Sequence, residues 1–183
     1  MLLTIFQEVP DHRRGQARQY NLEYVLLFSV LAIMSEADSY RRIHSWIKLH
    51  FKFLKRKFRL QWKQVPAYTT IRNIIQGVNS EELEKAFRKY SKEIANIDEG
   101  KYKFLSLDGK VVRGSFDHFQ DQKAIQVFSV FLTNTDIILA HEEIKNCKTN
   151  EIPVAQQIIE KLGLAKCVFT LDALHCQKKL LKL

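Results

Sequence analysis

The chain has 183 residues, with 29 Lys or Arg, 20 Asp or Glu and a formal net charge of +9. The apolar fraction of 46% and the charged fraction of 27% exclude wholesale disorder and suit one globular domain or two small ones. The longest apolar run, residues 22–34, is too short to span a bilayer, and residues 1–6 are too short for a secretory signal. We therefore expect a cytoplasmic protein without a membrane partner.

The positive charge is concentrated in residues 41–63, which contain nine basic and no acidic residues. The rest of the chain carries 20 bases and 20 acids. Aromatic residues interleave with this basic block, as they do in surfaces that bind polyanions. A solvated helix face whose aromatic residues belong to the core is an equally good interpretation of this stretch alone. The basic residues are Arg41, Arg42, Lys48, Lys52, Lys55, Arg56, Lys57, Arg59 and Lys63.

The first half of the chain is predicted to be helical. Residues 22–34 are apolar nearly all round, as in a central helix. A second helix is expected from Ser39 to about Leu54, with one apolar and one basic face. Residues 69–76 form a third helix, which has an apolar stripe and ends at Gly77.

A fourth helix is expected to begin at Asn79 or Ser80, because both residue types cap helices and acidic residues follow in the first turn. Residues 96–100 are polar and rich in turn formers, and the pattern changes after them. The sequence therefore predicts an all-α domain over residues 1–97 and a second domain over residues 98–183.

The second domain is predicted to have the order β-β-β-α-β, which makes the chain α+β overall. Its helix has Pro153 in the first turn and ends at Gly163. If the last strand pairs parallel with the first, their carboxyl ends lie together, where open α/β sheets place their ligand sites. The strands are expected at residues 102–107, 125–132, 136–141 and 167–171.

Asp108 and Asp172 each follow an apolar strand, 64 residues apart in the sequence. Two neighbouring carboxylates repel each other, and a divalent cation such as Mg²⁺ relieves that repulsion. The alternative is structural, since Asp-Gly is a common turn signal and Asp172 could cap a helix over residues 173–180. His141, His175 and Cys176 lack the spacing of a zinc site, and the three cysteines contain no C-x-x-C pair.

Seven short motifs occur in order along the chain: VPDHRR at 9–14, YNL at 20–22, DSY at 38–40, VPAYTTIR at 65–72, DGKVVRGS at 108–115, KTNEIP at 148–153 and TLDALHCQK at 170–178. Together they resemble the H-repeat-associated family of DDE-type insertion-sequence transposases, over nearly the whole chain. One departure is Ala67-Tyr68, where relatives tend to have a small polar residue. This departure is expected to alter the cap of the helix that carries Arg72 and Asn73.

The resemblance implies a ribonuclease H-like domain, incomplete in this sequence, that uses two Mg²⁺ ions or Mn²⁺ to cut and rejoin DNA. Asp108 and Asp172 would be its first two catalytic, metal-binding carboxylates. The third would lie on a later helix, beyond a further insertion, and this sequence has no position for it; Glu142, Glu143 and Glu151 are not assigned to that role. The expected DNA-binding residues are Lys110, Arg113, Arg41, Arg42, Lys48, Lys52, Lys55, Arg56, Arg72 and Asn73.

The chain is accordingly interpreted as a fragment of a transposase, nucleoid-associated and inactive alone because the third carboxylate is missing. Its partners would be DNA and either a second copy or a full-length transposase, with no small-molecule substrate. The alternative is a non-catalytic DNA-binding fragment that competes with a full-length transposase. A third interpretation is a basic scaffold protein without DNA affinity.

Overall fold

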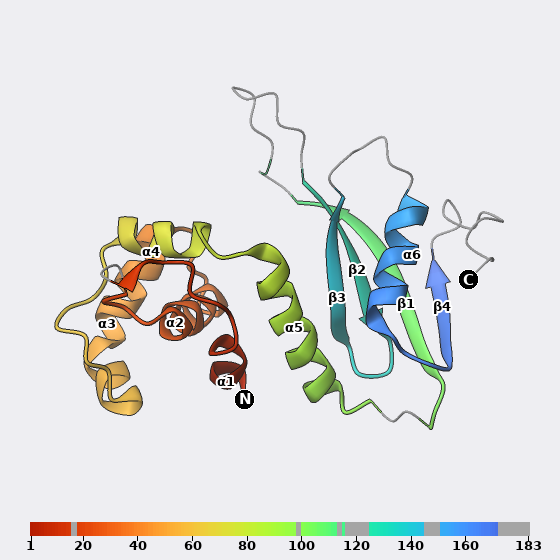
Figure 1. Cartoon of the computed structure of the whole chain (residues 1–183), viewed down its shortest axis with the longest axis horizontal. Helices are drawn as coiled ribbons and strands as arrows, with labels where there is room; N and C mark the ends of the chain where they lie inside the picture. Colours follow the sequence, from red (N-terminus) through yellow and green to blue (C-terminus); the bar gives the residue numbers. More distant parts are fainter. Residues whose placement is uncertain (16–17, 98–99, 113–114, 116–124, 145–150, 172–183) are drawn as a thin grey trace. The chain divides into compact units, whose positions relative to one another are not determined.

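The computed structural model describes the chain apart from residues 16–17, 98–99, 113–114, 116–124, 145–150 and 172–183. The chain divides into two compact units, Met1–Ala86 and Phe87–Leu183, and the division lies inside helix α5 (Ser80–Ala95). The first unit is helical, and the second contains a four-stranded mixed sheet (Figure 1). The mixed α and β content expected from the sequence is confirmed. None of the described helices is long and apolar enough to cross a membrane.

Helix α2 (Leu22–Met34) is the centre of the helical unit, which also contains α1 (Leu2–Phe6), α3 (Tyr40–Phe58) and α4 (Tyr68–Gln76). The residues of α2 are apolar nearly all round, and seven of the 13 are buried. A helix with this composition has no face suited to water, so it is stable only when neighbours cover several of its sides. Its bounds are those that the sequence predicts.

Trp62 lies between α3 and α4 and is almost completely buried, with 1% of its surface exposed. Its ring meets Tyr20 edge-on at 5.1 Å between centroids and contacts Tyr24 and Phe28 at 6.4 and 5.7 Å. Phe58 lies 5.4 Å from Phe28 and completes the cluster. Such aromatic pairs add roughly 0.5–1.5 kcal/mol each beyond their burial. Of the aromatic residues in the basic block, Trp62 therefore belongs to the core, and the half-buried Phe58 packs against the same cluster.

Helix α3 is longer than the sequence predicts, because it ends at Phe58 instead of near Leu54. Residues 55–57 are all basic and hide the continuation of the apolar stripe, in which Phe58 follows Leu54 at the i, i+4 spacing. The stop signal is conformational: Arg59 adopts the left-handed region, with φ 51° and ψ 42°.

The predicted helix starts are confirmed by their hydrogen bonds. The hydroxyl oxygen of Ser39 accepts a bond from the backbone N–H of Arg42 at 3.3 Å, ahead of α3. The side-chain oxygen of Asn79 accepts bonds from the N–H groups of Glu81 and Glu82 at 2.8 and 3.2 Å, at the start of α5. Each cap provides a partner for N–H groups that have none within the helix.

Helix α4 buries Ile71 and Ile74, which are 0% and 3% exposed, and its cap is Gly77, as predicted. A Cβ atom at Gly77 would overlap the imidazole ring of His12. The close approach of the N-terminal segment to the end of α4 therefore accounts for a glycine at this position.

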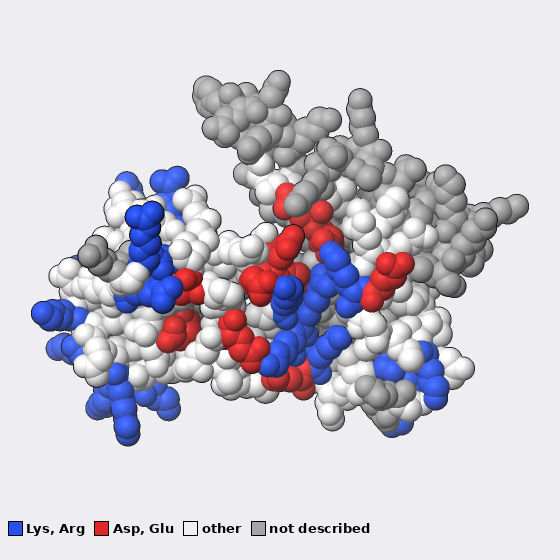
Figure 2. Space-filling model, viewed as in Figure 1, with Lys and Arg blue, Asp and Glu red and all other residues white. Residues whose placement is uncertain are grey.

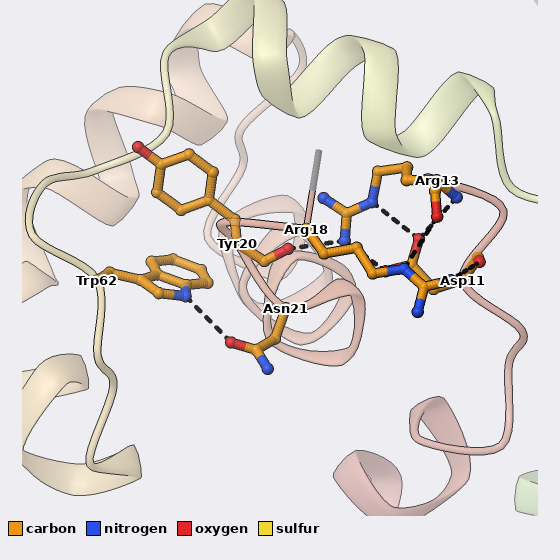
Figure 3. A network of polar contacts seen from close by, with 6 residues as sticks. All are labelled: Asp11, Arg13, Arg18, Tyr20, Asn21 and Trp62. Atoms are coloured by element: carbon orange, nitrogen blue, oxygen red, sulfur yellow. Dashed lines mark hydrogen bonds and ion pairs between the residues drawn. The ribbon is translucent and has the colours of Figure 1, made fainter. Parts of the chain in front are cut away.

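An ionic network holds the segment that precedes α2 (Figure 3). The Asp11 carboxylate accepts bonds from Nε and Nη2 of Arg13 at 2.9 and 2.8 Å, and Arg13 also donates to the carbonyl of Tyr20 at 2.7 Å. Arg18 donates to the backbone carbonyls of Arg13 and Asp11, each at 2.9 Å. The Arg13 side chain is only 8% exposed, so its charge needs the carboxylate as a partner. The side-chain bond from Arg13 lowers the pKa of Asp11 below its usual value.

The sheet of the second unit has the strand order β3-β2-β1-β4. Its elements are β1 (Lys103–Val111), β2 (Gln126–Leu132), β3 (Ile137–Ile144), α6 (Glu151–Leu162) and β4 (Cys167–Leu171). The β1–β2 and β2–β3 pairs are antiparallel, and β4 pairs parallel with β1. The predicted order β-β-β-α-β is confirmed, and the condition of a parallel pairing between the first and last strands is met.

One face of the sheet forms the core of this unit. Leu105 and Leu107 of β1 are buried with Phe128 and Val130 of β2, in a cluster that also contains Ile158 of α6. The alternate residues of β1 point to the other face, so Phe104 and Asp108 are exposed.

The expectation that the first strand stops before Asp108 is wrong. Strand β1 continues to Val111, and its residues 108–111 pair with residues 126–129 of β2. In this ladder the backbone N–H and C=O groups of residues 108–111 are paired with β2, whereas in a turn some of them would bind only water. Gly109 lies opposite Phe128 within the ladder, so Asp108-Gly109 is not a turn signal here.

We predict that Asp11→Asn lowers the free energy of unfolding at pH 7 by about 1–3 kcal/mol, because Arg13 loses a charged hydrogen-bond partner. The folded-state pKa of Asp11 is depressed, so its stabilisation is present above the unfolded pKa of about 4 and lost as the pH falls through the folded pKa. Urea denaturation at pH 7 and at about pH 2–3 measures both effects.

The matched control is Asp38→Asn, which removes an exposed ion pair with Arg42 whose side chains are 68% and 65% exposed. Its effect should be below about 1 kcal/mol. Equal losses for the two variants, or a loss for Asp11→Asn that persists at the lower pH, would contradict the role given to Asp11.

Candidate nucleic-acid interface and candidate metal site

The basic residues of α3 lie on its exposed side. Helix α3 buries Ile43, Ile47 and Leu54, and the bases occupy the remaining circumference. Figure 2 shows Lys and Arg side chains at several places on the visible face of the helical unit, with few acidic groups between them. All six predicted residues of this helix are exposed: Arg41, Arg42, Lys48, Lys52, Lys55 and Arg56.

Three of these six side chains already have a partner. Arg42 forms an ion pair with Asp38 at 3.2 Å, and the Lys55 ammonium donates to the Trp62 carbonyl at 2.8 Å. The guanidinium of Arg41 lies 5.2 Å from the centre of the Tyr68 ring. Within the described part of the chain, Lys48, Lys52 and Arg56 have no such partner, so their charges are open to a phosphate.

Arg72 and Asn73, also predicted to bind DNA, are exposed on α4. The structure adds Thr69 and Gln76, which share the exposed side of this helix with them. The sequence analysis missed these two residues, although their positions complement the apolar stripe and could have been found from it. Tyr68 at the start of α4 is 39% exposed.

Two contacts join α4 to α3 within the helical unit. Nδ1 of His44 lies 2.9 Å from the carbonyl oxygen of Pro66, in the residues leading to α4. The Arg41 guanidinium over Tyr68 is a cation–π contact of a kind that contributes about 0.5–1 kcal/mol at exposed sites. The exposed side of α4 is thereby held in a fixed relation to the basic side of α3.

Asp108 is the described member of the candidate carboxylate pair. Its side chain is 59% exposed, and one carboxylate oxygen lies 3.3 Å from the ammonium of Lys110, two residues along the same face of β1. Its partner in the ladder is Ser129 of β2. Asp108 is therefore an accessible carboxylate, and its oxygens are ligands of the kind that Mg²⁺ prefers. In the structure these oxygens face the Lys110 ammonium instead.

Asp172 and Arg113 lie outside the described residues, as do His175 and Cys176. The structure does describe the residues that precede the two aspartates: Leu107 of β1 pairs with Leu171 of β4 in the parallel ladder. Asp108 and Asp172 are the next residue in each case.

The other acids considered for a third ligand differ in their surroundings. Glu142 forms ion pairs with Arg88 at 3.2 Å and with Lys161 at 2.9 Å, so it joins β3 to α5 and α6. Glu143 is exposed, and the side chain of Glu151 lies outside the described part. Among the described residues, no group of three His, Cys, Asp or Glu side chains could hold a metal ion.

His141, which was considered as a ligand, and the described cysteine Cys167 are each packed within the sheet-containing unit. The ring of His141 packs against Phe87 at 4.5 Å between centroids. Cys167 is half-buried at the start of β4, and this burial raises the pKa of its thiol. Its low acidity argues against a reactive thiolate at neutral pH.

Residues 3–91 match the family described as DDE_Tnp_1-associated. The chain is 29% identical over 177 residues to "Putative transposase YncI" of Escherichia coli K12, which covers 97% of this chain and 70% of that protein. It has the same identity to YncI of Escherichia coli O157:H7, of which it covers 44%. It is 25% identical over 170 residues to "H repeat-associated putative transposase YhhI" of Escherichia coli K12, covering 93% of this chain and 44% of that protein.

The chain thus spans less than half the length of two of these relatives. No solved structure matches it significantly. The matches run through both the helical and the sheet-containing parts, and they agree with the motifs found in the sequence. These matches support membership of the chain in a transposase family that includes the H repeat-associated proteins.

Proposed function

We propose that the chain is the DNA-binding part and the beginning of the catalytic part of a DDE-type transposase. The single observation that carries the catalytic part of this proposal is the parallel pairing of Leu107 with Leu171, since an aspartate follows each of them. Parallel neighbours in register would bring the residues that follow this pair close together at the carboxyl end of β4, although β1 itself continues to Val111, and open α/β sheets bind ligands at the carboxyl ends of their strands. The sheet would accordingly be part of a ribonuclease H-like domain.

The helical unit would bind DNA through the basic side of α3 and the exposed side of α4. Lys48, Lys52 and Arg56 are exposed and lack partners among the described residues, and the block that contains them has no acid. Phosphate contacts of this kind provide most sequence-independent affinity for DNA. Arg41, Arg42 and Lys55 would add positive potential from the positions fixed by their present contacts.

Asp108 and Asp172 would hold the divalent ion or ions. A bound pair of Mg²⁺ ions supplies an activated water or hydroxyl and stabilises the leaving oxygen in phosphoryl transfer. Lys110, beside Asp108, and Arg113 would orient a phosphate of the DNA near the carboxylates. DNA cleavage and strand transfer are proposed for the whole protein, because the chain spans 44% of two of its relatives. The third carboxylate is not assigned in this chain.

We predict that Lys48→Ala reduces the slope of log affinity against log salt concentration by about 1, and that adding Lys52→Ala reduces it by about 2 in total. The reason is that each lysine that neutralises a phosphate releases about one counterion. The measurement is fluorescence anisotropy of a labelled duplex of about 30 base pairs, roughly three helical turns.

The matched control is Lys85→Ala, an exposed helical lysine whose ammonium lies 2.6 Å from Glu82. This paired lysine should leave the slope unchanged. A wild-type affinity that does not depend on salt would refute the proposed interface, and so would equal slopes for Lys48→Ala and wild type.

We predict that Asp108→Asn weakens the binding of Mn²⁺ by at least about tenfold, and that Asp172→Asn does the same, because each removes a charged oxygen ligand. Titration calorimetry or electron paramagnetic resonance of Mn²⁺ measures this directly, without an activity assay. The control is Asp136→Asn in the β2–β3 turn, where φ is 56° and asparagine is well tolerated.

Unchanged Mn²⁺ affinity in both Asp108→Asn and Asp172→Asn would show that these aspartates are not the metal ligands. Salt-dependent DNA binding without any Mn²⁺ binding would favour the alternative function, a non-catalytic fragment that competes with a full-length transposase for DNA.

A further inference from the structure

We propose that α4 reads base edges in the major groove of duplex DNA while α3 holds the phosphate backbone. The inference rests on the DNA-binding function proposed above, and it divides that function between two helices. The reading residues would be Thr69, Arg72, Asn73 and Gln76, and the phosphate-binding residues would include Lys48 and Lys52.

The exposed side of α4 is a single polar stripe. Positions 69, 72, 73 and 76 follow the i, i+3, i+4, i+7 spacing, so their side chains share one face of the helix. The opposite face is anchored, because Ile71 and Ile74 are 0% and 3% exposed. An α-helix is about 10–12 Å in diameter with its side chains, which fits a major groove about 12 Å wide, and the nine residues of α4 give it about two and a half turns along the groove.

The chemistry of the stripe is that of base recognition. An arginine fork matches the two acceptors of guanine, and the amides of asparagine and glutamine match the donor and acceptor of adenine. The methyl group of Thr69 can contact the methyl group of thymine. No acidic residue lies on α4, so nothing on this helix would repel the phosphates on either side of the groove.

The four side chains are available for such contacts. None of them has a hydrogen bond, ion pair or ring contact to another residue in the described parts of the chain, and Thr69, Arg72, Asn73 and Gln76 are all exposed. The exposed side of α5 differs, since Lys85 there is neutralised by Glu82. The exposed side of α4 has several unpaired hydrogen-bonding groups but only one charge, that of Arg72. Such a surface contributes little to the non-specific affinity for phosphates and more to discrimination among bases.

The phosphate-binding side is held beside this stripe. Around α3, Lys48 and Lys52 lie within about a quarter of a turn of Arg41 and His44, the residues that contact Tyr68 and Pro66. The basic side of α3 therefore adjoins α4 within the same unit. A fixed register between phosphate contacts and a reading helix is what sequence-specific binding requires.

The test is selection of duplexes from a pool with a randomised central segment of about 20 base pairs, using the full 183-residue chain. We expect the wild type to enrich a motif. Arg72→Lys keeps the charge but loses the planar fork, and Asn73→Ala loses the amide. Each should reduce preference at its own base pair by about five- to hundred-fold.

The same variants should keep their affinity for the unselected pool within about twofold and leave the salt slope unchanged. Lys48→Ala with Lys52→Ala should give the opposite result: the motif is kept and affinity for every duplex falls. The matched control for Asn73→Ala is Gln64→Ala, which removes an exposed amide outside α4 and should change neither property. Circular dichroism melting curves check that each variant is folded.

A motif that survives both Arg72→Lys and Asn73→Ala would overturn the inference, and so would salt-dependent binding without any enriched motif. Both of these results would leave the proposed DNA-binding function standing. The absence of salt-dependent binding to any duplex would overturn the proposed function and the inference together.

Discussion

The parallel pairing of β1 with β4 is the constraint on which the second unit depends. Parallel neighbours cannot be joined by a tight turn, so the chain must return through a crossover, which here contains α6. That helix covers the core face of the sheet through Ala155, Ile158 and Leu162. The parallel pairing of β1 with β4 therefore depends on the packing of α6 against the sheet, and the packing depends on the pairing. Together they bring Leu107 next to Leu171, although 63 residues lie between these positions in the sequence.

In the helical unit, the corresponding constraint is the burial of Trp62. This residue belongs to a basic segment that would otherwise be solvated, and its packing against Tyr20, Tyr24 and Phe28 draws the segment onto α2. The chain then enters α4 beside α3, where His44 and Arg41 contact it. A basic surface thus results from apolar packing, because Trp62 and Phe58 turn inward and the charged side chains remain outside.

The sequence predicted most helices and strands because their periodicity was strong, and the βα-β order made parallel pairing of the first and last strands one arrangement to consider. It failed where local signals were misleading. Helix α1 has only five residues, too few to show a period, and Asp108-Gly109 resembles a turn although β2 provides a ladder partner for it. Thr69 and Gln76 were missed because only the apolar side of α4 was used. The network of Asp11, Arg13 and Arg18 depends on main-chain carbonyls, whose directions a sequence does not reveal.

The ion pair of Asp108 with Lys110 links the structure of β1 to its proposed chemistry. Both side chains are largely exposed, at 59% and 82%, so the pair contributes at most about 1 kcal/mol and a divalent ion could displace it at little cost. Without a metal, the ammonium offsets the charge of the carboxylate. With a metal bound, the same ammonium would be released beside the site, where a DNA phosphate needs a positive partner. Because β1 continues past Asp108, Lys110 lies on the same face of the strand and would serve in both states of the proposed site.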